Sequence, residues 1–343
     1  MKALVLREYN LFAVADVDEP KPEADEVLVA VKACGICGSD VHGMDGSTGR
    51  RVPPIIMGHE AAGVIAEVGS SVTDWCVGDR VTFDSTIYCG KCAYCLRGRV
   101  NLCDNRRVLG VSCADYRQHG AFAEYVAIPR HILYKLPDSV SFAQAAMVEA
   151  LSIAVHAVRI TPVSLGDRAV VVGAGTIGLL IAQALRAAGC GAIAVVDIDK
   201  GRLDMAMDLG ATAVFDAKGC DVLEEVLKLT NQRGADLVFE AVGAPSTVDL
   251  SVSCVRKGGA VTLVGNASPK IELALQSTVT REITIRGSCA SAGEYPVCLD
   301  MMARGAVNVD ALISAVAPLS EGPAWFDRLH GREPGLMKVI LEP

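Results

Sequence analysis

The sequence predicts an α/β protein in which an irregular, mostly β first part is followed by a doubly wound parallel sheet. Two observations lead to this fold class. Up to about position 150, short β-rich runs such as Val27–Val31 and Ala61–Val68 are separated by turns rich in glycine and proline. From Ala169 onward, apolar strands alternate with helical segments, which is the pattern of a parallel sheet covered by helices.

The second part contains six expected strands. The helix after the first of them has apolar residues at i, i+3, i+4, i+7, i+8 and i+11, counted from Ile177, which is the stripe of a helix that packs on a sheet. A further helix is expected over Glu294–Ala303 and a last strand over Lys338–Leu341. The six strands are Ala169–Val172, Ala192–Asp197, Ala213–Asp216, Leu237–Glu240, Ala260–Val264 and Ile283–Arg286.

Composition and charge argue against a membrane protein, a secreted protein and a nucleic-acid-binding protein. The 343 residues allow two domains, and no uncharged apolar run reaches the roughly 18 residues of a spanning helix. Charged residues at Lys2 and Arg7 leave no room for a signal peptide, so we expect a cytoplasmic protein. The net charge of -8, without a basic cluster, argues against nucleic acid as a partner. Thirteen cysteines, an odd number, indicate metal binding or catalysis rather than disulfides.

A glycine-rich motif, G-x-G-x-x-G, lies between the first strand of the second part and its helix. Gly173 permits the tight turn, Gly175 lets the backbone approach a pyrophosphate, and Gly178 lets helix and strand pack closely. The pyrophosphate then meets the unpaired N–H groups at the helix N-terminus. The motif predicts a dinucleotide site that also includes Thr176 and Ile177.

Asp197 ends the second strand, 24 residues after Gly173, where a carboxylate can accept hydrogen bonds from the adenosine ribose. A 2′-phosphate at this place would be repelled, so Asp197 favours NAD over NADP. Arg202 follows closely, and an arginine can also hold a 2′-phosphate, which keeps NADP open.

Four cysteines are grouped as C-x2-C-x2-C-x7-C in a segment without hydrophobic periodicity. Four thiolates at this spacing suit a tetrahedral zinc ion with no open position, which is a structural site. An iron–sulfur cluster is the alternative, but the last spacing does not fit one. The four residues are Cys89, Cys92, Cys95 and Cys103.

A second metal site is suggested by Cys37, His59 and Glu149. Cys37 lies in G-I-C-G-S-D, and His59 follows 22 residues later. Glu149 lies in an apolar run, where a carboxylate is unfavourable unless it is paired or bound to metal. Taken separately, each has an ordinary explanation: a buried thiol, a core histidine, a helix carboxylate facing solvent.

Taken together, these motifs resemble the zinc-dependent medium-chain dehydrogenase family, in particular its sorbitol, threonine and polyol dehydrogenase branch. The resemblance spans the whole chain and keeps the order of the motifs. It implies a GroES-like catalytic domain over 1–152 and 288–343 that carries two zinc ions, and a Rossmann NAD-binding domain over 153–287. The motifs are Gly35–Asp40, Gly58–Glu60, the four cysteines, Gly120–Tyr125, Glu149, the glycine motif and Asp197.

The resemblance also implies roles for individual residues. Cys37, His59 and Glu149 would hold the catalytic zinc, with Glu60 as an auxiliary ligand and Asp40 orienting His59. Ser39 and then His42 would carry the proton away. The backbones of Val242, Val264 and Gly265 would contact the nicotinamide. The implied activity is hydride transfer from a secondary alcohol or polyol to NAD, giving a ketone, in a homodimer or homotetramer.

The sequence departs from mammalian-type sorbitol dehydrogenases at two places that bear on the substrate. Gly43 stands where those enzymes carry an aromatic residue, and Ser288–Ser291 stands where they carry an arginine–tyrosine pair. A threonine 3-dehydrogenase-like or galactitol 1-phosphate-like enzyme is therefore a second interpretation. The loop Ser47–Arg51 could hold a phosphate, although we expect its arginines to be solvated. A zinc-ribbon interaction protein is a third, disfavoured by the acidic charge.

Overall fold

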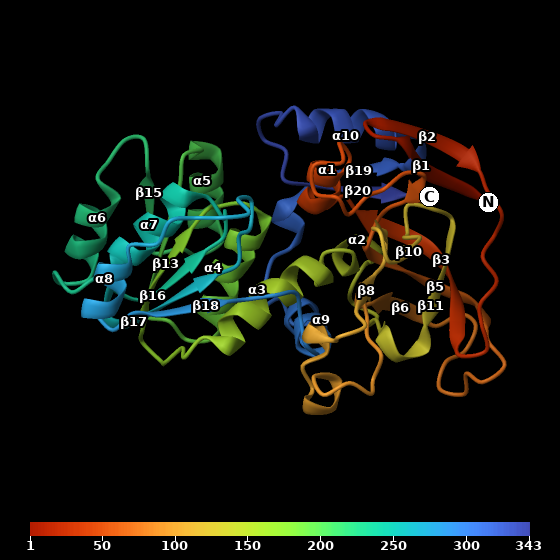
Figure 1. Ribbon diagram of the computed structural model, residues 1–343, viewed down its shortest axis with the longest axis horizontal. Coiled ribbons are helices and arrows are strands. Elements are labelled where there is room, and N and C mark those ends of the chain that lie inside the picture. Colours follow the sequence, from red (N-terminus) through yellow and green to blue (C-terminus); the bar gives the residue numbers. More distant parts are fainter. The chain divides into compact units, whose positions relative to one another are not determined.

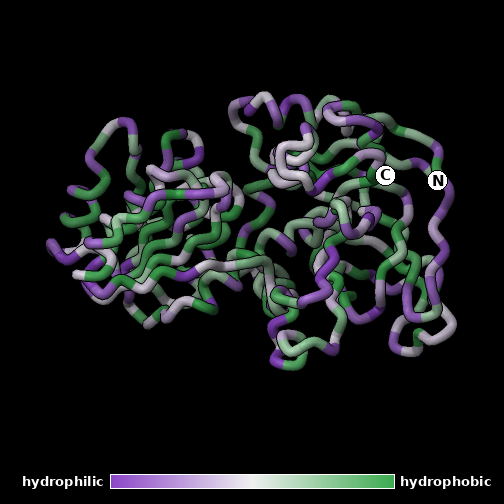
Figure 2. The backbone as a smooth tube through the Cα atoms, in the orientation of Figure 1, coloured by the Kyte–Doolittle hydropathy of each residue, from purple (hydrophilic) through white to green (hydrophobic).

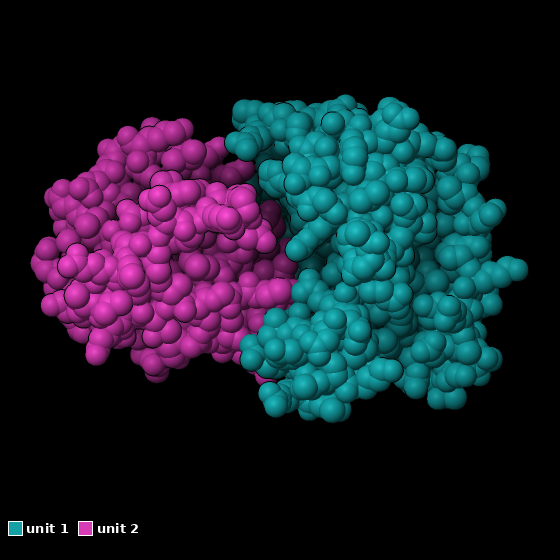
Figure 3. Space-filling model, viewed as in Figure 1, with its two compact units in different colours: residues 1–149, 295–304, 309–343 teal, residues 150–294, 305–308 magenta.

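The computed structural model describes residues 1–343 and divides the chain into two compact units, coloured separately in Figure 3. Unit 1 comprises residues 1–149, 295–304 and 309–343, and unit 2 comprises residues 150–294 and 305–308. The chain thus leaves unit 1 after Glu149 and returns to it at Tyr295. From the sequence, we expected these two crossings after residues 152 and 287.

Unit 2 is built on a six-stranded parallel sheet with the strand order β15-β14-β13-β16-β17-β18. Figure 1 labels β13, β15, β16, β17 and β18 of this sheet. The direction of strand addition reverses between β13 and β16, and ligands of such sheets bind at this switch point. The six predicted strands are confirmed within a few residues. The strands are β13 (Arg168–Val172), β14 (Ala192–Asp197), β15 (Ala213–Asp216), β16 (Ala235–Glu240), β17 (Val255–Leu263) and β18 (Thr284–Gly287).

Helices connect these strands. The central strands are apolar between their ends, as Figure 2 shows, because helices cover both faces of such a sheet. Val170, Val238 and Val261 are fully or almost fully buried in this core. The helices are α3 (Val148–Ile160), which begins in unit 1, α4 (Thr176–Ala187), α5 (Lys200–Asp208), α6 (Val222–Leu229), α7 (Pro245–Cys254) and α8 (Leu275–Thr280).

Unit 1 is mostly β, and its main sheet has the order β12-β6-β5-β3-β20-β19, with β11 also pairing with β3. The long strand β3 (Glu26–Gly35) pairs antiparallel with β5 (Glu60–Val68) on one side and with β20 (Lys338–Glu342) on the other. The last strand, β20, therefore pairs with a strand from the N-terminal part of the chain. The remaining sheet members are β6 (Arg80–Phe83), β11 (Tyr125–Pro129), β12 (Leu133–Lys135) and β19 (Ile313–Pro318).

Smaller elements complete unit 1. Phe326 of α10 packs against Phe12 and Phe122, with ring centroids 4.2 and 5.8 Å apart, so the C-terminal helix closes the core of the N-terminal strands. No helix of the protein is both long and apolar enough to cross a lipid bilayer. The elements are β1 (Lys2–Glu8), β2 (Leu11–Asp16), β4 (Ile55–Ile56), β7 (Thr86–Ile87), β8 (Arg107–Val108), β9 (Val111–Ser112), β10 (Arg117–Gln118), α1 (Gly38–Gly43), α2 (Phe142–Ala145), α9 (Tyr295–Ala303) and α10 (Gly322–His330).

Glu294, the last residue of unit 2 before the chain returns to unit 1, ties that segment to α3. Its carboxylate lies 2.9 Å from His156 Nδ1 and 3.2 Å from Arg159 Nη1, and it accepts a hydrogen bond from the Ala292 amide. Burial raises the pKa of Glu294, but the hydrogen bonds and the charges of His156 and Arg159 outweigh this, so its pKa is below the ordinary value.

A lowered carboxyl pKa means that the charged form stabilises the fold at neutral pH and that this contribution is lost as the pH falls. We expect Glu294→Gln to lower the Tm at pH 7, and the difference from the unchanged protein to shrink as the pH falls from 6 toward 4. Thermal unfolding of both proteins across this range measures the difference. A Tm difference that stays constant with pH would contradict the assignment.

Candidate active site

Cys37, His59 and Glu60 meet at the ends of two paired strands of unit 1. Cys37 precedes α1, and Glu60 begins β5, opposite Gly35 of β3. One ligand atom from each of the three residues lies within 4.8 Å of the other two. A Cβ atom at Gly35 would stand 2.7 Å from Glu60 Oε2, so glycine at this place leaves room for the carboxylate.

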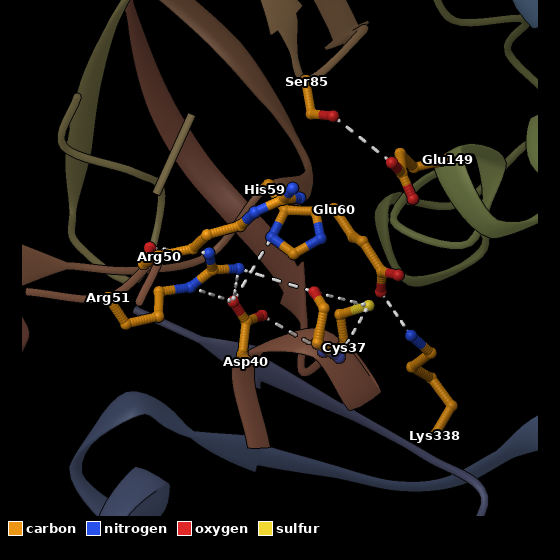
Figure 4. A network of polar contacts seen from close by, with 10 residues as sticks. Cys37, Asp40, Arg50, Arg51, His59, Glu60, Ser85, Glu149 and Lys338 are labelled. Carbon is orange, nitrogen blue, oxygen red and sulfur yellow. Dashed lines mark hydrogen bonds and ion pairs between the residues drawn. The ribbon is translucent and has the colours of Figure 1, made fainter. Parts of the chain in front are cut away.

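His59 is oriented from behind by a buried carboxylate. Its Nδ1 lies 3.4 Å from Oδ1 of Asp40, whose side chain is fully buried (Figure 4). Burial alone lowers the pKa of His59, but Asp40 and Cys37 outweigh it and raise that pKa well above its usual range. For the Asp40 carboxyl the effects are reversed: burial raises its pKa, but the nearby His59 and Arg51 outweigh burial and bring that pKa below the ordinary range. The arrangement leaves the other ring nitrogen of His59 for a metal.

Glu60 has a buried cationic partner from the far end of the chain. Lys338, the first residue of β20, pairs with Glu60 Oε2, and both side chains are almost inaccessible to solvent. Burial lowers the pKa of Lys338, but the charges of Glu60 and Cys37 raise it above the usual value. Glu60 and Cys37 therefore favour the charged form of this buried lysine.

Glu149 lies in the first turn of α3, and its Oε1 accepts a hydrogen bond from Ser85 Oγ at 3.2 Å. Burial raises its pKa to about 7; Glu60 and Asp84 also raise it, whereas His59 lowers it. Glu149 is not one of the three residues whose ligand atoms meet within 4.8 Å. In this structure, then, the carboxylate that joins Cys37 and His59 belongs to Glu60.

The three residues fit a zinc ion. Sulfur, imidazole nitrogen and carboxylate oxygen are its usual protein ligands, and three of them leave a fourth position open, as in catalytic zinc sites. Two of the three residues are buried, and the third, Cys37, is partly exposed, so the open position can face solvent or a substrate.

The four cysteines also converge. Their sulfur atoms lie within 4.8 Å of one another, and those of Cys92 and Cys95 are 3.5 Å apart, close to the roughly 3.8 Å edge of a tetrahedral zinc–thiolate site. Hydrogen bonds from the amides of Lys91 and Cys92 lower the pKa of Cys89 to about 6. Partial burial and the neighbouring thiols raise the pKa of Cys95 to about 12. Four thiolates at these distances would repel one another, and a zinc ion held by the four sulfur atoms would offset their charge.

The glycine motif forms a turn and helix start suited to a pyrophosphate. Gly173 has a φ of 103°, and Gly175 is the N-cap of α4. A Cβ at Gly178 would overlap the carbonyl oxygen of Gly173, so this glycine sets the close approach of helix and turn. Thr176 and Ile177 are the first two residues of α4 and are partly exposed.

Asp197 is connected directly to this turn. Its Oδ2 accepts a hydrogen bond from Ala174 N at 2.6 Å, and its Oδ1 accepts from Ile198 N and Asp199 N at 2.7 and 3.0 Å. The carboxylate is thus fixed at the end of β14, beside the glycine motif. Arg202 lies in the first turn of α5, its amide bonded to the Asp199 side chain.

Val242, Val264 and Gly265, which the resemblance places beside the nicotinamide, are all hydrogen-bonded to Glu240. This buried residue was not among those predicted from the sequence. Glu240, at the end of β16, accepts hydrogen bonds from the amides of Val242 and Gly243, and its carbonyl accepts from Val264 and Gly265. Glu240 is fully buried. It therefore joins the turns that follow β16 and β17.

Comparison with known proteins agrees with this geometry. Residues 23–138 match the family model of the alcohol dehydrogenase GroES-like domain, and residues 176–304 match that of the zinc-binding dehydrogenases. Sorbitol dehydrogenase of Bacillus subtilis is 35% identical over all of this chain and 97% of its own length. The chain belongs to the zinc-dependent medium-chain alcohol dehydrogenase family.

A second curated relative supports the polyol branch, and a solved structure supports the family fold. D-arabitol-phosphate dehydrogenase of Enterococcus avium is 35% identical over 97% of this chain and 94% of its own length. A structure titled as a zinc-binding dehydrogenase of Sinorhizobium meliloti 1021, bound to NADP, superposes with a TM-score of 0.91 at 33% identity over 100% of this chain and 99% of that one.

Within the dehydrogenase, the two residues proposed to move the proton lie on α1. Ser39 Oγ donates to Cys37 Sγ at 3.3 Å, and His42 lies three residues further along, exposed to solvent. Our expectation that the arginines of the Ser47–Arg51 loop are solvated is correct for Arg50 but wrong for Arg51. Arg51 is only 4% exposed because its guanidinium is bonded to Asp40.

Proposed function

We propose that the protein oxidises a secondary hydroxyl of a neutral polyol to a ketone, with NAD as the hydride acceptor. The observation that carries this proposal is the convergence of Cys37, His59 and Glu60, of which Cys37 is partly exposed and the other two are buried. It provides three zinc ligands and an open position in a chain that also has a dinucleotide turn.

A zinc ion at these ligands would supply Lewis-acid stabilisation of the negative charge that develops on the substrate oxygen. The protein's own residues prepare the site. Asp40 holds the far side of the His59 ring, and Lys338 balances the charge of Glu60. Ser39, beside Cys37, would accept the substrate proton on its hydroxyl oxygen and give up its own hydrogen toward His42, which stands on the same helix and faces solvent.

The contacts of Arg51 favour a neutral substrate over a polyol phosphate. Arg51 donates to Asp40 at 2.9 and 3.3 Å, so its guanidinium is not available to a phosphate. A phosphorylated polyol is the second candidate, supported by the similarity to D-arabitol-phosphate dehydrogenase. A threonine 3-dehydrogenase-like activity is a third.

Zinc content and a substrate panel together test the proposal. We expect two zinc ions per chain in the purified protein, and NAD reduction with a higher kcat/KM on polyols such as sorbitol, iditol or galactitol than on their phosphates or on threonine. A higher kcat/KM on the phosphates would establish the second candidate instead. One zinc per chain, held by the four cysteines, would overturn the proposed mechanism.

The choice of NAD rests on Asp197. A charge pair at about 4 Å changes binding by about 4 kcal/mol at an effective dielectric of about 20. We therefore expect Asp197→Asn to shift the ratio of kcat/KM values for NAD and NADP toward NADP at least about 100-fold, since about 1.4 kcal/mol corresponds to a factor of ten. Asp204→Asn, an exposed carboxylate on the following helix α5, is the control. An unchanged ratio in Asp197→Asn would mean that another residue selects the cofactor.

We further propose a cytoplasmic homodimer or homotetramer. All thirteen cysteines are free thiols in the structure, which suits a reducing compartment. Analytical ultracentrifugation of the purified protein distinguishes the two assemblies from a monomer.

A further inference from the structure

Arg51 bridges two side chains of α1. Its Nη2 donates to Asp40 Oδ1 at 2.9 Å and to Ser39 Oγ at 3.4 Å, and its Nε donates to the same Asp40 oxygen at 3.3 Å. Its Nη1 donates to the carbonyl of Arg50 at 3.0 Å, which holds the guanidinium to its own loop (Figure 4). A planar guanidinium presents five N–H groups in a fixed fork and can span acceptors on different sides, whereas an ammonium group is a compact point charge.

Each of the two side chains that Arg51 contacts is in turn in contact with a different proposed zinc ligand. Asp40 faces His59 Nδ1, and Ser39 Oγ donates to Cys37 Sγ at 3.3 Å. Because Ser39 Oγ accepts from Arg51, its own hydrogen is directed to the sulfur. One guanidinium therefore sets the orientation of both the imidazole support and the serine hydroxyl.

Space for the arginine is provided by Gly43, in the last turn of α1. A Cβ atom at this position would lie 2.6 Å from Arg51 Cγ and 3.3 Å from Thr48 Oγ1. Since Gly43 is itself buried, a side chain there would have to displace the stem of Arg51. The glycine and the arginine form a matched pair.

We infer that Arg51 is a positioning residue for alcohol oxidation, which holds Asp40 against His59 and holds the Ser39 hydroxyl against Cys37. This inference rests on the proposed function, because it gives Arg51 a purpose only if Cys37 and His59 bind the metal. The residues that carry it come from one short segment, 37–51, and from His59.

The test compares Arg51→Met, Arg51→Lys and Gly43→Ala with the unchanged protein, and uses Arg50→Met as the matched control on the exposed neighbour. Three properties are measured: the rate of zinc loss to a chelator, the visible absorption spectrum after Co²⁺ replaces the more labile zinc, and kcat with KM. The first two need no substrate. Tm is recorded for every variant.

We expect Arg51→Met to lose the more labile zinc about 10- to 100-fold faster, the usual effect of removing an outer partner of a metal ligand, and to alter the Co²⁺ spectrum. Its kcat falls, while KM for NAD is unchanged. Arg51→Lys recovers zinc retention, because its ammonium can take the place of Nε beside Asp40 Oδ1, but it does not recover kcat, because the shorter side chain does not reach the position of Nη2 beside Ser39. Gly43→Ala shows the Arg51→Met changes in milder form, and Arg50→Met matches the unchanged protein.

A lower Tm of Arg51→Met, with zinc loss, Co²⁺ spectrum and kcat all unchanged, would show a purely structural role and overturn the inference. Should Arg51→Met fail to fold because the buried Asp40 carboxylate loses its arginine partner, Arg51→Lys and Gly43→Ala decide, and unchanged spectra and kcat in both would overturn the inference. Failure of the proposed function is recognised separately, as a parent protein that binds two zinc ions but oxidises no alcohol.

Discussion

Replacing Cys37 by serine is expected to leave one zinc ion per chain and to lower kcat/KM by about 1,000-fold. Lewis-acid stabilisation by a metal contributes several kcal/mol, and each 1.36 kcal/mol corresponds to a factor of ten in rate. The remaining zinc is the one held by the four cysteines. Metal analysis and steady-state kinetics on the best polyol measure both quantities.

Cys76→Ser is the matched control for this variant, because Cys76 is an exposed cysteine of the same unit. It should keep two zinc ions and full activity. His59→Ala should repeat the result of Cys37→Ser, since both remove a ligand of the same ion. Two zinc ions and undiminished NAD reduction in either ligand variant would refute the zinc site.

Lys338→Met is expected to destabilise the protein by about 3–5 kcal/mol when zinc is absent, because it leaves the Glu60 carboxylate buried without its partner. The loss should be smaller in the zinc-loaded protein, in which the metal also offsets the charge of Glu60. Chemical unfolding with and without a zinc chelator measures the two values.

Two companion variants separate charge from packing at this pair. Lys338→Arg keeps the positive charge and should retain most of the stability. The double change Glu60→Gln with Lys338→Met removes both charges, so it should be more stable than Lys338→Met alone without zinc. If the double variant were no more stable than the single one, the loss would come from packing of the lysine stem and not from the buried charge.

The parts of the fold and site that could be predicted from the sequence are those that depend on near neighbours in the chain. The turn at Gly173 is flanked by its strand and helix, and the four cysteines lie within one segment, so their spacing alone indicates the chemistry. The alternation of strands and helices likewise predicted the sheet of unit 2, because its connections are short and regular.

What escaped prediction are the buried charges that only the fold brings together. Lys338 follows an ordinary loop and reads as a surface lysine, and nothing in its own segment indicates that β20 lies beside β3. Arg51 follows an exposed arginine in a loop, so solvation was the natural interpretation. Glu240 is a carboxylate at the end of an apolar strand, and this position was the one sequence feature that could have indicated its role. It accepts hydrogen bonds from the turn that follows the strand.

The two proposed metal sites can form at different times during synthesis, because β20 is translated long after the four cysteines. Cys89 and Cys103 are 14 residues apart, so the four-cysteine site can close as soon as that segment has left the ribosome. Lys338 is 278 residues beyond its partner Glu60, so it is added long after the four cysteines. Until Lys338 is added, Glu60 is without its counter-charge, so the proposed ligands Cys37, His59 and Glu60 take their final arrangement well after the four-cysteine segment can close.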